Sequence, residues 1–188
     1  VLDDGQEGVA GTLRSMVKRL GEPAIRAAVG RAMKEMGRQF VLGQTIEQAL
    51  ENAREREAIG FTYSYDMLGE AAMTEADAAR YADDYERAIA AIGKAATRGS
   101  VTANPGISIK LSALHPRYEV TNEKRVLAEL VPVVTKLARM AREAGIGMHV
   151  DAEEQARLTL SFKVIDAVMA DPALNGWDGF GIVVQAYE

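Results

Sequence analysis

Four short segments of the chain alternate apolar and polar residues, and they lie at 61–66, 107–110, 146–151 and 180–185. Because successive side chains of a strand point to opposite faces, each segment presents one large apolar face and one small polar face. The second face, of small and mostly polar residues, carries Thr62, Ser64, Asp66, Ser108, Lys110, Ser112, Gly147, His149, Asp151, Gly181, Val183 and Gln185. The pattern therefore predicts four strands with similar faces.

Helical patterns separate these strands. Helices are expected over residues 75–98, from Asn122 to about residue 144, and over about 153–170. Apolar residues recur in them at three- and four-residue spacing, which is typical of a helix that buries one side. The buried side of the third helix is predicted to carry Leu158, Phe162, Ile165 and Met169. A strand, helix, strand order predicts a parallel sheet whose apolar face lies under the helices.

The fold class predicted from this order is α/β, a (β/α)8 barrel of the TIM type. Residues 1–58 are expected to form an all-helical arm and residues 59–188 the first half of the barrel, about four strands. A closed barrel of this type has about 250 residues, so we expect the chain to be part of a larger catalytic domain. The carboxyl ends of the strands, where such barrels place their active sites, would gather Asp66, Lys110, Asp151 and Gln185.

Composition narrows the class of protein. The 188 residues carry a formal net charge of −5, and the 22 lysines and arginines are scattered along the chain, so no nucleic-acid partner is expected for this segment. The absence of cysteine excludes disulfides and thiolate chemistry. No apolar run approaches the roughly 20 residues of a membrane span. A cytoplasmic protein is expected, with peripheral contact at the inner membrane still open.

Lys110 is the most informative candidate residue. A lysine on the inner face of a barrel can bind an anionic substrate group or, when desolvated, form a Schiff base. The alternative is a structural ion pair with Asp66 or Asp151. Each of these aspartates can in turn orient a cofactor or hold a cationic substrate nitrogen. For Asp151, capping of a helix that begins at residues 152–154 is an equal alternative.

The remaining candidates are weaker. His149 and Asp151 have a spacing that metal sites use, but the first strand lacks the second histidine pair of a barrel metallohydrolase, so no metal is expected. Gln185 can donate and accept hydrogen bonds, which suits the edge of a planar heterocycle, or it can be a satisfied interior amide. The sequence alone predicts only that Glu70 is an exposed acidic residue.

These residues stand in stretches that resemble a known family. They are MGRQFV at 36–41, YDMLGE at 65–70, GISIKLSALHPRY at 106–118, DAEE at 151–154 and VQAY at 184–187. They are similar to the proline dehydrogenase domain of the bacterial bifunctional proline utilization A flavoenzymes. The resemblance covers nearly the whole chain.

The resemblance implies a distorted (β/α)8 barrel that carries noncovalent FAD at the strand ends. It also implies oxidation of L-proline to Δ1-pyrroline-5-carboxylate by hydride transfer to the flavin, with a membrane quinone as electron acceptor. By this likeness Asp66 and Lys110 would line the proline pocket, and Glu70 would form a gating ion pair with an arginine of the last barrel helix. Asp151, Val183 and Gln185 would contact the flavin.

The family's other substrate and phosphate contacts are expected beyond residue 188, as is its aldehyde dehydrogenase module, and the DNA-binding N-terminal domain of some relatives is expected to be absent. The isolated chain is therefore expected to be inactive and oligomeric. Two alternatives stay open. One is a Schiff-base aldolase that uses Lys110 on a similar barrel, and the other is a noncatalytic half-barrel.

Overall fold

The computed structural model describes residues 40–187 and, before them, residues 21, 23, 26, 27, 29–33 and 35–37. The chain divides into two compact units, Val1–Gln44 and Thr45–Glu188, and each is considered by itself. In the first unit, the described residues between 21 and 37 are helical. Residues 1–20 of the predicted arm lie outside the described residues.

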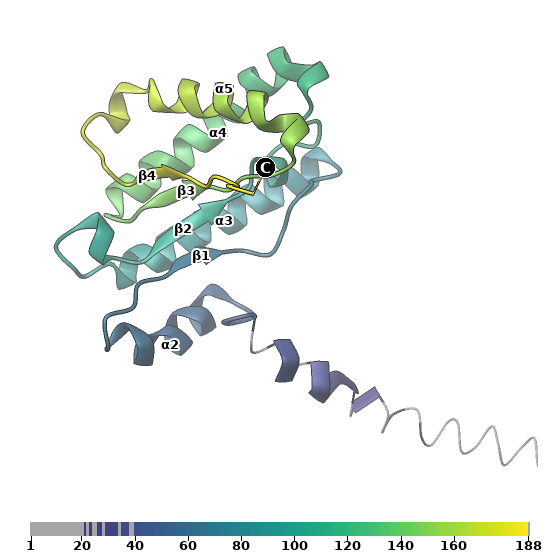
Figure 1. The fold of residues 1–188 in the computed structure, drawn as a ribbon, viewed down its shortest axis with the longest axis vertical. Helices are drawn as coiled ribbons and strands as arrows, with labels where there is room; N and C mark the ends of the chain where they lie inside the picture. The colour runs from purple at the N-terminus through teal and green to yellow at the C-terminus, as the bar shows by residue number, and fades with distance from the viewer. Residues whose placement is uncertain are drawn as a thin grey trace, which may run out of the picture. The chain divides into compact units, whose positions relative to one another are not determined.

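The second unit contains a four-stranded sheet (Figure 1). Its elements are α2 (Ile46–Glu57), β1 (Ser64–Asp66), α3 (Glu75–Ala95), β2 (Gly106–Ile109), α4 (Glu123–Glu143), β3 (Met148–Val150), α5 (Leu158–Met169) and β4 (Phe180–Ile182). The strands are parallel and lie in chain order, β1-β2-β3-β4. The predicted order of strands and helices is confirmed, and it places the carboxyl ends of all four strands along one edge of the sheet.

Capping residues start the helices. Thr45 accepts a hydrogen bond from the backbone of Gln48 over 3.3 Å at the start of α2. At the start of α3, Thr74 and Asp77 form a reciprocal capping box that satisfies two backbone donors. Helix α3 ends at Ala95, earlier than expected. The chain then turns, and the backbone N–H of Arg98 donates to Asn104 Oδ1 over 2.8 Å.

The core lies between the strands and the helices. The apolar residues of β2 and β3 are buried, and α3 packs on β2 while α4 packs against both α3 and α5. The buried residues of α4 recur at three- and four-residue spacing and include Val126, Leu130, Val134 and Leu137. The burial of the apolar residues of β2 and β3 confirms the apolar strand face that alternation predicts for these two central strands.

The third helix differs from its prediction. It begins at Leu158, after a 3-10 turn at Gln155–Arg157, and not at residue 153. Three of its four expected core residues, Leu158, Phe162 and Met169, are exposed, and only Ile165 is buried. The buried row is instead Leu160, Val164 and Val168. Both rows are apolar at helical spacing, so periodicity alone did not distinguish the row that faces α4.

The last strand also departs from the expected burial. Ile182 and Val184 alternate with Val183 and Gln185 and therefore fall on the predicted apolar face, but both are exposed, Val184 by 71%. The physical reason is position, because β4 pairs only with β3 among the described residues. The backbone N–H of Val183 continues this pairing to the carbonyl of Val150 over 2.9 Å.

Candidate functional site

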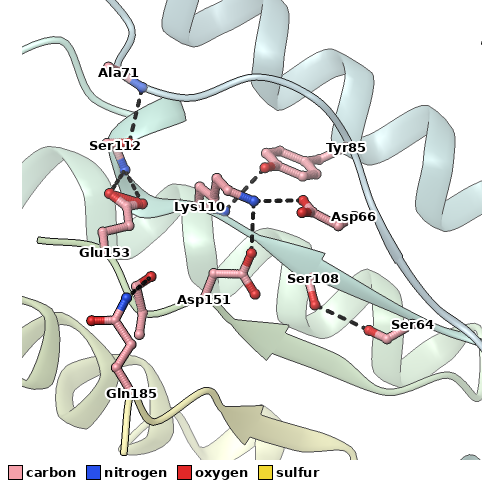
Figure 2. Close-up of polar contacts among 11 residues, drawn as sticks. Ser64, Asp66, Ala71, Tyr85, Ser108, Lys110, Ser112, Asp151, Glu153 and Gln185 are labelled. Carbon is pink, nitrogen blue, oxygen red and sulfur yellow. Dashed lines mark hydrogen bonds and ion pairs between the residues drawn. The ribbon is translucent and has the colours of Figure 1, made fainter. Parts of the chain in front are cut away.

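Lys110 forms ion pairs with two carboxylates at the carboxyl edge of the sheet (Figure 2). Its Nζ lies 2.7 Å from Asp66 Oδ1 and 2.8 Å from Asp151 Oδ2. Asp66 is the last residue of β1, and the other two directly follow β2 and β3. Because the three strands are parallel neighbours, their ends meet, and side chains 41 and 44 positions apart in sequence come into contact.

The two carboxylates keep the lysine charged. Burial lowers the pKa of the Lys110 ammonium, but hydrogen bonds and negative charge from Asp151 and Asp66 outweigh it and raise the pKa above the usual lysine range. The Lys110 and Asp151 side chains are 16% and 18% exposed, whereas Asp66 is 49% exposed. One ammonium thus faces two carboxylates in a partly solvated pocket.

Tyr85 supports this lysine from helix α3. The backbone N–H of Lys110 donates to the Tyr85 hydroxyl over 3.1 Å, and the tyrosine is almost fully buried. Burial raises the pKa of Tyr85 to about 12, so the phenol is neutral at physiological pH. The backbone at Lys110 is therefore fixed on the helix side of the sheet.

A second group of polar contacts lies next to the first. The backbone N–H of Ser112 donates to the Glu153 carboxylate, 3.1 Å to Oε1 and 3.3 Å to Oε2. The Ser112 hydroxyl accepts from the backbone N–H of Ala71 over 3.0 Å. Burial raises the pKa of the Glu153 carboxyl above its usual range, although the Ser112 hydrogen bonds oppose the shift. These contacts join the segments that follow β1, β2 and β3.

A cleft of about 280 Å³ lies beside the ion pairs, between the end of β3, the start of α5 and the end of β4. Asp151, Val183 and Gln185 are among its lining residues. The Gln185 amide donates to the carbonyl of Ala152 over 3.4 Å. The buried hydroxyl of Tyr118, also in the lining, has no hydrogen-bond partner among the described residues. The lining combines apolar side chains with charged and polar ones, and small-molecule and cofactor sites pair apolar surface with such orienting polar groups.

The structure separates the sequence-predicted residues into groups. Asp66, Lys110 and Asp151 come together, and Val183 and Gln185 share the adjacent cleft with Asp151. Glu70 is exposed, in the segment after β1, and forms no ion pair with a described residue. The ion pairs of Lys110 with Asp66 and Asp151, considered from the sequence as a structural alternative, are present. A structural lysine and a substrate-binding lysine would both show this geometry, so mutation must distinguish them.

The capping role considered for Asp151 is wrong. Residues 151–154 are not helical, and the Asp151 carboxylate pairs with Lys110. His149 lies against Gly181, with its Nδ1 atom buried and without a hydrogen-bond partner in the described part of the chain. Among the described residues, no group of three or more histidine, cysteine, aspartate or glutamate side chains is placed to hold a metal ion.

Sequence reasoning missed three residues of this region. Tyr85 is not among the candidates named from the sequence, and Glu153 was predicted only as the start of a helix. Ser112 was assigned to a strand face, without a partner. The available signal for Glu153 was its place in the DAEE stretch, which interrupts helical periodicity just after a strand.

The parallel sheet and its charged carboxyl edge define the chain as part of a (β/α) barrel. Residues 49–188 match the family described as Proline dehydrogenase. The chain belongs to the proline dehydrogenase family.

Known proteins similar to this chain include the Bifunctional protein PutA of Salmonella typhimurium, 51% identical over 177 residues, which are 94% of this chain and 13% of that protein. The Proline dehydrogenase of Deinococcus radiodurans is 25% identical over 165 residues, 88% of this chain and 49% of its own. A crystal structure of a Bradyrhizobium japonicum proline utilization A variant superposes with a TM-score of 0.74 at 54% identity, covering 93% of this chain and 18% of that one. The chain thus spans less than a fifth of the two bifunctional relatives and about half of the Deinococcus radiodurans protein.

The comparisons also correct one expectation. Residues 1–40 match the family described as DNA-binding domain of Proline dehydrogenase. This match is at odds with the expectation of no nucleic-acid partner and with the expected absence of such a domain. The scattered distribution of lysines and arginines was therefore an insufficient reason to exclude a nucleic-acid partner. Separately, no helix in the described part of the chain is long and apolar enough to cross a membrane.

Proposed function

We propose that a protein carrying this chain oxidises L-proline to Δ1-pyrroline-5-carboxylate with FAD as cofactor and a membrane quinone as the final electron acceptor. The observation that carries the proposal is the Lys110 ion-pair cluster, which lies at the carboxyl edge of the sheet within the segment that matches the family. In barrels of this type, that edge holds the active site. A location at the inner face of the membrane would bring the site close to its acceptor.

The charges of the cluster complement a zwitterionic amino acid. The Lys110 ammonium can bind the carboxylate of proline, and Asp66, half exposed, can attract the cationic nitrogen. The substrate then lies along the edge of the sheet with both charged groups engaged. Conversion to the imine removes a hydride from C5 and a proton from the nitrogen, and the carboxylates nearby are suited to hold that proton.

The lining of the 280 Å³ cleft fits one edge of a flavin. Asp151, Val183 and Gln185 offer a carboxylate, a backbone segment and an amide, and the amide can meet both donors and acceptors of a heterocycle. FAD, when bound there, supplies the two-electron acceptor for the hydride. Asp151 belongs to both the cleft and the ion-pair cluster, so it would set the position of the substrate relative to the cofactor.

Glu70 is proposed as the substrate gate. Its exposed position in the segment after β1 leaves it accessible to an arginine from the rest of the barrel. An ion pair formed there after proline binds would limit the access of water to the site.

The Schiff-base aldolase is disfavoured by the same cluster. A lysine nucleophile must lose its proton, and lysines with this role have lowered pKa values. The pKa of Lys110 is instead raised by Asp151 and Asp66. The cluster favours a lysine that binds charge over one that attacks a carbonyl.

The test uses a longer polypeptide that contains residues 1–188 and the remainder of a bifunctional protein of this family. It is called the extended protein below. Anaerobic addition of L-proline should bleach the flavin absorbance near 450 nm, and a membrane-soluble quinone should restore it. D-proline serves as the control. An extended protein that purifies without flavin, or whose flavin is indifferent to L-proline, would contradict the proposal.

A further inference from the structure

We propose that Glu153 and Ser112 are positioning residues that fix the Glu70 segment relative to Lys110. The inference rests on the proposed function, because it assigns these two residues to substrate entry at that same site. Neither residue contacts the Lys110 ammonium in the described structure, so they would act through the backbone segments that they hold.

The first step is the contact between Glu153 and Ser112. Ser112 is two residues after Lys110 and 4% exposed, and its backbone N–H donates to the Glu153 carboxylate. Hydrogen bonds from a backbone N–H to a carboxylate are stronger than neutral ones, most of all where water is excluded. Together with the bond from Lys110 N–H to Tyr85, this contact holds the lysine's backbone from both sides.

The second step joins Ser112 to the segment after β1. Its hydroxyl accepts from Ala71 N–H over 3.0 Å, and its carbonyl accepts from Ala72 N–H over 2.9 Å. Figure 2 shows the continuous line from Glu153 through Ser112 to Ala71. Three segments from three strand ends are thereby held together by one buried serine. We call this the Ser112 latch.

The third step is the conformation of the residues around Glu70. Ala71 has φ +49°, a left-handed conformation that is strained for a residue with a Cβ. Gly69 has φ +153° and packs so closely on Tyr81 that an added Cβ would overlap Cε1 of that ring. Strained backbone persists only where its surroundings hold it, and the two hydrogen bonds to Ser112 do so here.

From these steps, loss of the Ser112 latch should release the Glu70 segment and leave the Lys110 ion pairs in place. Substrate capture would weaken more than the chemical step. A purely structural role would instead lower thermal stability without separating KM from kcat.

The experiment compares Glu153→Ala, Ser112→Ala and Glu153→Gln in the extended protein. Glu153→Ala should raise KM for proline by about 10-fold, the size expected for one hydrogen bond to a charged group. Ser112→Ala loses a neutral hydrogen bond from Ala71 N–H and should raise KM by about 3- to 10-fold. In both variants kcat should change by less than about 3-fold. Glu153→Gln should have a smaller effect because its amide oxygen still accepts from Ser112. Glu143→Gln, which alters an exposed carboxylate at the end of α4 that does not line the cleft, is the matched control and should leave both constants unchanged.

A second measurement keeps the inference testable if those variants fold poorly. Ala71→Val changes an exposed side chain and makes the left-handed backbone more costly, so it should speed amide exchange in residues 69–72 and raise KM with little change in thermal stability. Unchanged KM and exchange in Ala71→Val, or in both latch variants, would overturn the inference. If the unsubstituted extended protein fails to oxidise proline, the proposed function fails, and amide exchange in Glu153→Ala alone decides whether the latch exists.

Discussion

At the scale of single residues, the site depends on the unequal exposure of three charges. Lys110 and Asp151 are mostly covered, and Asp66 is the member of the cluster most open to solvent. A buried ion pair loses much of its Coulomb energy to desolvation, so its presence is weak support for a stabilising role. A partly open cluster is better suited to exchanging one of its contacts for a charged ligand.

Replacing Lys110 separates substrate binding from cofactor binding. In the extended protein, Lys110→Met should lower kcat/KM for proline by about 10- to 100-fold, because one charge-assisted contact is lost. The flavin should stay bound, since Asp151, Val183 and Gln185 keep their places. Steady-state kinetics and the flavin absorbance per polypeptide measure the two effects. Unchanged kinetics would show that Lys110 does not bind the substrate and that its ion pairs are purely structural.

Glu153 should make stability depend on pH. Burial raises its pKa in the folded protein, while Ser112 and Arg157 oppose the shift and Glu154 adds to it. A raised pKa means that the folded state holds the proton more tightly, so this contribution is present at acidic pH and is lost as pH rises through the folded pKa. Glu153→Gln should therefore gain stability relative to the unsubstituted protein as pH rises from the usual carboxyl range. Thermal unfolding of both proteins between pH 4 and 8 measures the difference, and a constant difference would contradict it.

Alternation in the sequence could place Asp66, Lys110 and Asp151 on one face because a strand has a fixed two-residue period. The roles of Tyr85 and Glu153 could not be predicted in this way. Both act through contacts between segments distant in sequence, a helix and a loop, whose approach depends on packing and not on a repeat.

At the scale of elements, helical periodicity agrees with the buried side of α4 but not with that of α5. In α4, Val126, Leu130, Val134 and Leu137 recur at helical spacing and are buried. Helix α5 has two apolar rows, and it begins only after Glu153, whose carboxylate binds Ser112, a contact that the sequence did not reveal. The sequence pattern therefore predicted neither where α5 begins nor which of its sides is buried.

Close approach of β2 and β3 requires glycine at position 106. A Cβ added to Gly106 would lie 2.9 Å from the carbonyl oxygen of Gly147, which belongs to backbone and cannot rotate away. Gly106→Ala should therefore destabilise the sheet by about 1–3 kcal/mol, a shift of roughly 2–10 °C. Flavin release on heating the extended protein measures it. Gly99→Ala, where no heavy atom lies within 4 Å, is the matched control, and equal release temperatures for the two variants would contradict the argument.

At the scale of the whole molecule, the second unit presents two sheet edges. Strand β1 pairs only with β2 and strand β4 only with β3 among the described residues, so backbone groups of both are open to further pairing. Ile182, Val184 and Tyr187 add exposed apolar surface at the β4 side. Unpaired edges and exposed apolar patches promote association.

We therefore expect residues 1–188 on their own to associate and to neither oxidise proline nor retain flavin. The cleft beside Asp151 is open to water, and charged contacts weaken in such an environment. Light scattering after size-exclusion chromatography should give a mass above the 20.3 kDa of one chain, and a proline–dye assay should give no turnover. The extended protein, assayed in parallel, shows whether the assay itself works. A monodisperse monomer that turns over proline would show that the four strands suffice for the site and that the unpaired strand edges do not cause association.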